Sequence, residues 1–206
     1  MGMLVWEWLE RPGLDVAVVS REPGGFHVVE GHAVVAWDGD TLDLRYRLTC
    51  DTDWVFRDVT LRTALGSATH HLTLCHDEGG WWADGQARPD LAAAVDIDIM
   101  ATPVTNTLPI RRSNWAPGQR HDFTMAYIRL PELVVVPVAQ RYTALEPGHF
   151  RYELVPGASY AGPSDAPGYH RVDDGFTAEL EVDADGFVLH YPPYWRRRPA
   201  AGSGLA

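Results

Sequence analysis

The chain has 206 residues, of which 46% are hydrophobic and 22% are charged, and its formal net charge at pH 7 is −11. This length fits one large domain or two small ones, and the negative charge argues against nucleic acid as a main partner. All 17 Lys and Arg positions hold arginine, which excludes lysine chemistry such as a Schiff base or a phosphate-loop lysine.

In chain order, the sequence predicts an almost entirely β structure. The apolar runs are short, rich in Val, Tyr, Trp and Phe, and separated by turns such as Glu78-Gly79-Gly80 and Asp185-Gly186. A helix is predicted only over Pro89–Ala94, because proline suits a first helical turn. Many short strands at this spacing predict a curved sheet, a sandwich or a barrel and not a βαβ fold. The predicted strands are Val5–Glu10, Val16–Arg21, Phe26–Trp37, Leu42–Cys50, Trp54–Leu65, His70–His76, Trp81–Ala83, Val95–Met100, Asp122–Leu130, Leu133–Tyr142, Phe150–Leu154, Phe176–Val182 and Phe187–Tyr191.

The strands are expected to form a single β domain over residues 1–198, followed by a flexible tail over residues 199–206. A faint internal repeat runs through this domain, in which Tyr46 and the turn at Gly79-Gly80 are echoed by Tyr142 and the turn at Asp185-Gly186. If a duplication produced it, halves of about 15–85 and 120–192 form similar antiparallel meanders in one sheet. The spacings within the two halves differ, so chance similarity is the alternative.

The two cysteines and the N-terminus indicate where the protein resides. Cys50 and Cys75 lie in predicted strands, and two thiols alone make neither a disulfide scaffold nor a zinc site. Met1–Glu10 has no basic region and no long apolar region, so no secretory signal is expected. No apolar run approaches the roughly 20 residues that a membrane-spanning helix needs. These features predict a cytoplasmic protein with reduced cysteines.

The run from Asp96 to Arg112 stands out among these elements. It begins as a strict alternation, which places Asp96 and Asp98 on one strand face and the isoleucines between them on the other. Two prolines, several small polar residues and two adjacent arginines follow, a mixture expected to bury poorly and to form neither helix nor strand cleanly. Two interpretations stay open: the run shapes a site, or it is a structural crossing in which Asp and Arg neutralise each other.

A long segment without element signals, Ala158–Gly175, is rich in Gly, Pro, Ser and Asp. A loop of this length in a compact domain is either a functional lid or disordered. We expect it to lie over or beside the mouth of a cavity and to be more mobile than the sheet, because it has few apolar anchors.

Several segments resemble the signature of the bacterial putative glycolipid-binding family. They are Asp96–Asp98, Thr102–Arg112, Gln140–Thr143, Arg151–Glu153, Asp185–Pro192 and Arg196-Arg197, and the resemblance extends from Trp6 to about Arg198. It implies a heavily β, internally duplicated, half-open barrel, similar in outline to bacterial lipoprotein carriers that hold acyl chains. It implies a glycolipid or another amphipathic molecule as ligand and supplies no catalytic residues.

A glycolipid site needs an apolar cavity, aromatic faces for sugar rings and a few polar or cationic groups. Arginine is a planar donor suited to phosphate or carboxylate, although pairing with Asp96 or Asp98 is the alternative role of the two adjacent arginines. Because they diverge in an extended chain, one is expected to face the ligand while the other forms a structural ion pair. The candidate ligand-binding residues are Thr105, Asn106, Arg111, Arg112, Arg141, Tyr142 and Trp81. Trp81 and Trp82 are neighbours on a strand, so they should point to opposite faces.

Two chemical alternatives accompany this reading. Asp96 and Asp98 would lie about 6–7 Å apart, close to the carboxylate separations of glycosidases, but two carboxylates from one strand usually line the same wall. Strand alternation splits the metal-ligand types of His70–Asp77 between two faces, so neither a metal nor a cofactor is predicted. The sequence therefore predicts a non-catalytic glycolipid-binding protein. A hydrolase acting on a sugar or lipid in the same cleft is the alternative, and a homodimeric scaffold is a third reading.

Overall fold

The structure, a computed structural model, describes residues 2–155 and 176–199, so the predicted loop Ala158–Gly175 and nearly all of the predicted tail lie outside it. The described strands form one 15-stranded sheet in the order β8-β7-β6-β5-β4-β3-β2-β1-β15-β14-β13-β12-β11-β10-β9. Neighbours are antiparallel except β9 and β10, which are parallel. The strands are β1 (Gly2–Trp8), β2 (Gly13–Arg21), β3 (His27–Trp37), β4 (Asp40–Cys50), β5 (Phe56–Leu65), β6 (Ala68–Asp77), β7 (Gly80–Ala83), β8 (Gln86–Ala87), β9 (Ala94–Ile99), β10 (Arg120–Arg129), β11 (Val134–Glu146), β12 (His149–Leu154), β13 (Thr177–Val182), β14 (Val188–Tyr191) and β15 (Trp195–Arg197).

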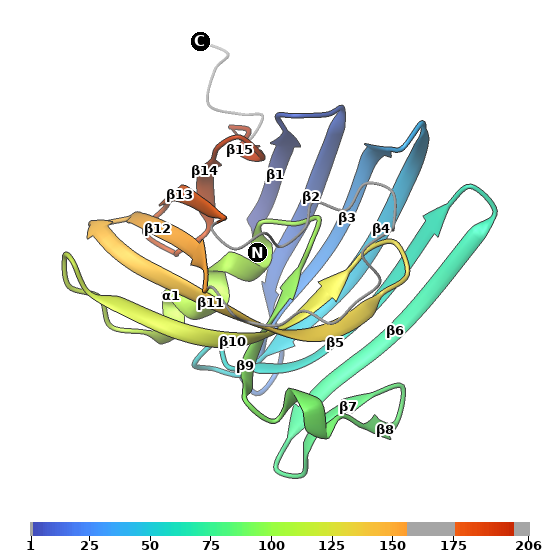
Figure 1. The fold of residues 1–206 in the computed structure, drawn as a ribbon, viewed down its shortest axis with the longest axis horizontal. Helices are drawn as coiled ribbons and strands as arrows, with labels where there is room; N and C mark the ends of the chain where they lie inside the picture. Colours follow the sequence, from blue (N-terminus) through green and yellow to red (C-terminus); the bar gives the residue numbers. More distant parts are fainter. Residues whose placement is uncertain (1, 156–175, 200–206) are drawn as a thin grey trace.

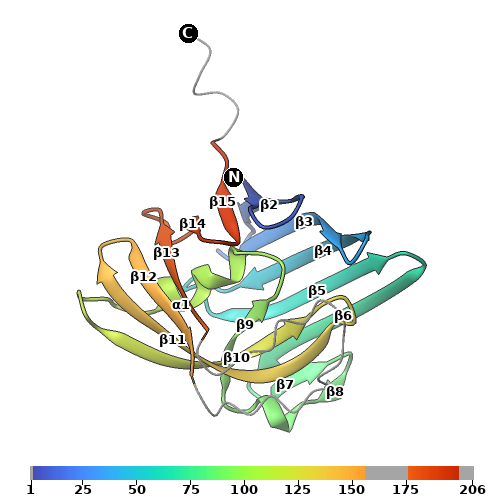
Figure 2. The ribbon, with the colours of Figure 1, turned by 45° about the horizontal axis from the view of Figure 1, so that its top comes forward.

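The sheet curves into a half-open barrel with two arms. Strands β1–β6 make one arm, strands β10–β14 make the other, and the short helix α1 (Thr107–Arg112) lies between them (Figures 1 and 2). Strands β8 and β9 stand at the two ends of the sheet and do not pair with each other, so the barrel stays open. This confirms the predicted class, a mainly β chain with one short helix. The duplication of two halves stays a prediction.

The predicted strands all appear, with ends that differ by a few residues. The two strands that the sequence does not reveal are β8, with two residues, and β15, with three. Such short strands carry no alternation to read, and only their hydrogen-bonded neighbours define them. The alternation rule holds at the paired tryptophans. Trp81 is buried between the rings of Phe56 and His76, whereas Trp82 is half-buried and donates a hydrogen bond to Asp77.

The location of the helix was predicted wrongly. Pro89–Leu91 forms a single 3-10 turn, η1, and β9 begins at Ala94, so the predicted helix has no room to continue. The α-helix instead occupies Thr107–Arg112, directly after a second 3-10 turn, η2 (Val104–Asn106). Pro109 is the third residue of α1, where backbone N–H groups have no partner within the helix, so its missing donor costs little. None of the described helices is long and apolar enough to cross a membrane.

The expectation that this run buries poorly is also wrong, because it joins two hydrophobic clusters. The larger cluster draws on β1–β7, β9, β15 and the ends of β10 and β11 that lie near them, and it includes Leu108. The smaller cluster lies under β10–β14 and includes Ile110. Both side chains are buried, as are the polar residues Thr105, Asn106 and Thr107. Apolar side chains on two sides of a single helical turn bridge the two clusters, which explains why a polar, proline-containing segment sits in the interior.

Each arm contributes one buried tyrosine, Tyr46 or Tyr142, that is hydrogen-bonded to the crossing segment Thr102–Arg112. On one side, the Tyr46 hydroxyl of β4 donates to Asp15 Oδ2 at 3.0 Å, and Thr102 Oγ1 donates to the same oxygen at 2.5 Å. On the other side, Asn106 Nδ2 donates to the Tyr142 hydroxyl of β11 at 2.9 Å. The Tyr46 ring lies against Gly31, where a Cβ atom would stand 1.9 Å from Tyr46 Cζ, so only glycine fits there.

Candidate ligand-binding cavity

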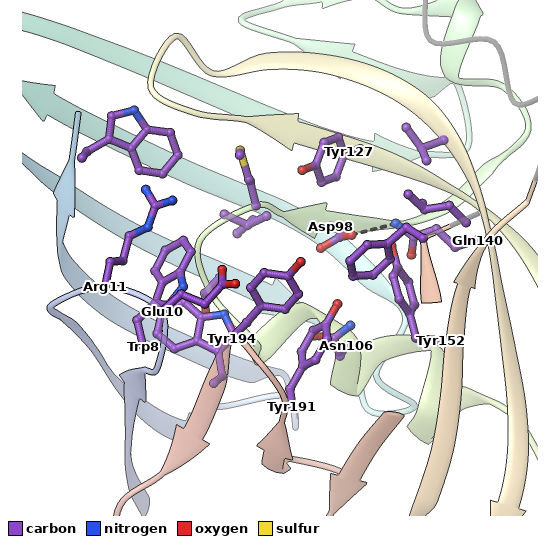
Figure 3. A pocket seen from close by; sticks show the side chains of 18 residues that line it. Trp8, Glu10, Arg11, Asp98, Asn106, Tyr127, Gln140, Tyr152, Tyr191 and Tyr194 are labelled. Carbon is purple, nitrogen blue, oxygen red and sulfur yellow. Dashed lines mark hydrogen bonds between the residues drawn. The ribbon is translucent and has the colours of Figure 1, made fainter. Parts of the chain in front are cut away.

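A partly enclosed cavity of about 150 Å³ lies between the two arms, beside the crossing. The side chains that line it come from both ends of the chain and from its middle (Figure 3). They are Trp8, Glu10, Arg11, Trp37, Asp98, Ile99, Met100, Thr102, Asn106, Tyr127, Val138, Gln140, Tyr152, Leu154, Phe176, Tyr191, Tyr194 and Trp195. The cavity forms where β1 meets β15 and β14, because this junction brings the two arms together.

Eight of the 18 lining residues are aromatic, and several of their rings contact one another. The ring centroids of Trp8 and Trp195 are 4.7 Å apart, and Tyr191 lies edge-on to Tyr194 at 5.4 Å and to Tyr152 at 6.3 Å. Rings in mutual edge-to-face contact have little rotational freedom, so the shape of this wall is set before any ligand arrives.

The polar part of the cavity centres on Asp98 of β9. Gln140 Nε2 donates to Asp98 Oδ2 at 2.7 Å, and Thr105 Oγ1 donates to Asp98 Oδ1 at 3.1 Å. Burial raises the pKa of Asp98, and the hydrogen bonds from Gln140 and Thr105 partly oppose that rise. Within the described ranges, Asp98 forms no ion pair, and the buried amide oxygen of Gln140 accepts no hydrogen bond.

The charged residues of the β1–β2 turn line the outer part of the cavity. Glu10 is exposed, whereas Arg11 is half-buried, with its guanidinium carbon 5.0 Å from the ring centroid of Trp8 and 5.4 Å from that of Trp37. Such cation–π contacts hold the arginine against the two indoles. The cation is thereby kept at the tryptophan side of the cavity.

The structure brings two of the predicted site residues to this cavity. Asn106 lines it, and Thr105 holds Asp98 from behind. Tyr142 is buried behind Asn106, to which its hydroxyl is bonded, and it does not line the cavity. Trp81 lies in the larger hydrophobic cluster, away from the lining.

The three predicted arginines do not line the cavity. Arg112 pairs with the fully buried Asp96 at 2.7 Å and donates to the carbonyl oxygen of Val95 at 2.9 Å. Arg141 makes two hydrogen bonds, of 2.6 and 2.7 Å, to the exposed carboxylate of Asp122. Each of these two guanidiniums therefore has a protein partner.

Arg111 lies elsewhere, in a second and more open hollow of about 580 Å³ near the turn before β14. Its guanidinium stands over the ring of Trp54 at 4.4 Å and donates to the carbonyl oxygen of Asp185. No buried polar atom without a partner lines this hollow among the residues that the structure describes. The partly enclosed cavity is therefore the better candidate site.

Sequence reasoning missed the aromatic wall and Gln140. The close grouping of Tyr191, Tyr194 and Trp195 was a usable signal, since it concentrates three aromatic side chains in one short segment beside two prolines. Gln140 lies in a segment that carries the family resemblance, yet nothing in the sequence aims it at Asp98. Trp8 could not be found, because only the pairing of β1 with β15 brings it to the site.

The comparisons with known proteins agree on one family. The family model described as "Putative glycolipid-binding" matches residues 3–197. A crystal structure of a DUF1089 family protein from Pseudomonas aeruginosa superposes with a TM-score of 0.73. The two chains share 31% sequence identity, and the match covers 89% of this chain and 92% of that one. None of the curated proteins matches the chain.

Proposed function

Because the chain belongs to the putative glycolipid-binding family, we propose that it binds a glycolipid-like amphipathic molecule whose sugar end enters the aromatic cavity. The observation that carries this proposal is the partly enclosed cavity itself, with ring-lined walls around a small polar centre. Sites for small molecules are concave and mostly apolar, and a few placed polar groups give them specificity. Aromatic faces suit the apolar face of a sugar ring, and Asp98, Asn106 and Gln140 suit its hydroxyls.

The size of the cavity limits what enters it. A dry cavity of about 150 Å³ holds one benzene-sized group, whereas whole drug-sized ligands occupy roughly 300–1,000 Å³. A volume of about 150 Å³ therefore suits a single ring. In this proposal the lipid part of the ligand lies outside the enclosed space.

The carboxylates support binding more than hydrolysis. A glycosidase needs two carboxyl groups that flank the scissile bond. Asp96, the neighbour of Asp98 on the same strand face, is fully buried in an ion pair with Arg112 and does not line the cavity. The other carboxylate of the lining is Glu10, which is exposed at the outer part of the cavity, whereas Asp98 lies at its polar centre. The proposed role is to hold the ligand unchanged.

Octyl glucoside, a one-ring analogue of a glycolipid, tests this proposal. Trp8, Trp37 and Trp195 line the cavity, so binding should change the intrinsic tryptophan fluorescence. Val138→Phe fills the cavity from β11 and should abolish that change. Val134→Phe makes the same substitution at a position on β11 that is 45% exposed and outside the lining, so binding should persist.

Two results would contradict the proposal. One is normal binding by a folded Val138→Phe variant, checked by circular dichroism, because the ligand would then sit elsewhere. The other is release of octanol or glucose from octyl glucoside during long incubation, followed by mass spectrometry. Release would favour the hydrolase over the binding protein.

A further inference from the structure

Two aspartates on strand β9 differ in whether a positively charged side chain pairs with them. Asp96 and Asp98 lie on the same strand face of β9, and burial raises the pKa of each. Asp96 has Arg112 at 2.7 Å as a counter-charge. Asp98 has only the neutral donors Gln140 and Thr105 among the described residues. An ionised carboxylate is costly to bury without a counter-charge, and among the described residues Asp98, unlike Asp96, has no ion-pair partner.

The groups around Asp98 are mainly acceptors. Each carboxylate oxygen accepts one hydrogen bond within the protein and has room for another. The amide oxygen of Gln140, a residue that is 1% exposed, accepts none in the described part of the chain. Arg11, the arginine that lines the cavity, is held against two indole rings. A ligand that donates several hydrogen bonds here gives partners to more of these acceptor oxygens than a ligand that accepts hydrogen bonds.

The tyrosines of the wall lie within the field of Asp98. Burial raises the pKa of Tyr152 and of Tyr191 well above the ordinary value, and the charge of Asp98 adds to the rise in both. Their phenols therefore stay neutral. Rings gathered around a carboxylate form the kind of aromatic cage that recognises ammonium groups, because the face of each ring is electron-rich.

We propose that the group entering this cavity carries a protonated amine, so that the ligand is an amino sugar glycolipid whose ammonium group binds Asp98 and the amide oxygen of Gln140. This inference rests on the proposed function, because it specifies the ring that the cavity holds. An ammonium group offers three donors and a positive charge, which complements the acceptors at this point. A neutral sugar offers hydroxyl groups but leaves Asp98 without a counter-charge.

Two octyl glycosides that differ in one ring substituent test the proposal at pH 7: octyl glucosaminide, with an amine, and octyl glucoside, with a hydroxyl. We expect the unmodified protein to bind the glucosaminide at least roughly tenfold more tightly, as charge-assisted hydrogen bonds predict. In Asp98→Asn the two affinities should become equal. Asp122→Asn removes the same charge from an exposed site outside the cavity, and it should keep the full preference.

Each other outcome overturns a specific statement. Equal affinities in the unmodified protein overturn the amine assignment and leave the proposed function intact. Binding of neither glycoside overturns both. A preference that survives Asp98→Asn but disappears in Glu10→Gln assigns the amine to the outer carboxylate and refutes the role of Asp98.

If Asp98→Asn does not fold, the unmodified protein still decides the question. An ammonium group enclosed against Asp98 is shielded from salt, so its preference should be nearly the same at 0.05 and 0.5 M NaCl. Attraction by the exposed Glu10 or by the net charge of −11 is screened at high salt. If the ratio of the affinity for the glucosaminide to that for the glucoside falls to one at 0.5 M NaCl, the proposal is overturned.

Discussion

At the scale of single residues, the interior depends on three aspartates with different partners, of which Asp15 and Asp96 are fully buried and Asp98 is half-buried at the cavity. Asp15 is held by hydroxyl groups, Asp96 by an arginine, and Asp98 by an amide and a hydroxyl. Burial is the largest influence on the pKa of all three, and it raises each. Their partners determine how each responds to substitution and to pH.

Replacing Arg112 with Ala should destabilise the protein by roughly 3–5 kcal/mol, because it leaves the carboxylate of Asp96 buried without a counter-charge. Arg141→Ala is the matched control, since its partner Asp122 is exposed, and stability should change little. Urea unfolding of both variants measures the difference. Equal losses would show that the buried pair contributes no more than the exposed one.

The stability of the protein should depend on pH through Asp15. Burial raises the pKa of this carboxyl from 3.8 to about 6, although hydrogen bonds from Thr102 and Tyr46 oppose the rise. The folded state therefore binds this proton more tightly than the unfolded state does. The stabilisation is fully present below about pH 4 and is lost as the pH rises through 6, a change on the order of 3 kcal/mol.

Asp15→Asn removes this titration, so the free energy of unfolding of the unmodified protein should fall relative to the variant between pH 4.5 and pH 7. Asp96, whose pKa is also raised to about 6, is present in both proteins and cancels in the comparison. Parallel pH profiles in urea unfolding would rule out the contribution of Asp15.

At the scale of elements, the sequence revealed those strands whose periodicity is local. The alternation in β4, β5 and β6 is long enough to read without knowing the neighbours. Helix α1 was missed because it has six residues, and helices this short are stabilised by the clusters that Leu108 and Ile110 join. Its burial is a property of the two arms and not of its own residue pattern.

The same limit applies to the site. Thr105 and Asn106 were placed at the ligand from a local motif; in the structure Asn106 lines the cavity, and Thr105 is hydrogen-bonded to the lining residue Asp98. Arg111, Arg112 and Arg141 were chosen for their chemistry, but each has a partner within the protein. Ion pairs between residues that are far apart in the chain cannot be identified from a single sequence.

Close packing between β3 and β4 gives a test at this scale. Gly31→Ala would place Cβ against the Tyr46 ring and displace its hydroxyl from Asp15, so we expect a loss of about 2–3 kcal/mol in urea unfolding. In a Tyr46→Leu background the ring is gone, and Gly31→Ala should cost much less. Additive losses would show that the glycine matters for another reason.

At the scale of the whole molecule, the first and last described strands are neighbours. Trp6, Glu7 and Trp8 of β1 pair with β15, and Arg198 donates its backbone N–H to the carbonyl oxygen of Val5 at 2.7 Å. The indole N–H of Trp6 also reaches the carbonyl oxygen of Val188 in β14 at 2.7 Å. The two ends of the described chain therefore lie close together at the junction that forms the cavity.

This proximity predicts that a circular permutant folds. A short linker from the end of β15 to the start of β1, with new ends between the exposed residues Gly66 and Ser67, leaves every strand intact. Circular dichroism should be unchanged, and octyl glucoside should bind as in the unmodified protein. A folded permutant that has lost binding would indicate that the junction needs free ends.

The pairing of β1 with β15 also has a consequence for folding during synthesis on the ribosome. Of the described strands, β1 leaves the ribosome first, and β15, which covers its second edge, leaves last. Until then β1 exposes unpaired backbone groups, to which a strand of another nascent chain could add. Tyr191, Tyr194 and Trp195 arrive in the same late segment, so a growing chain that lacks β15 holds no finished site. Loading with ligand is thus confined to the period after β15 has paired with β1.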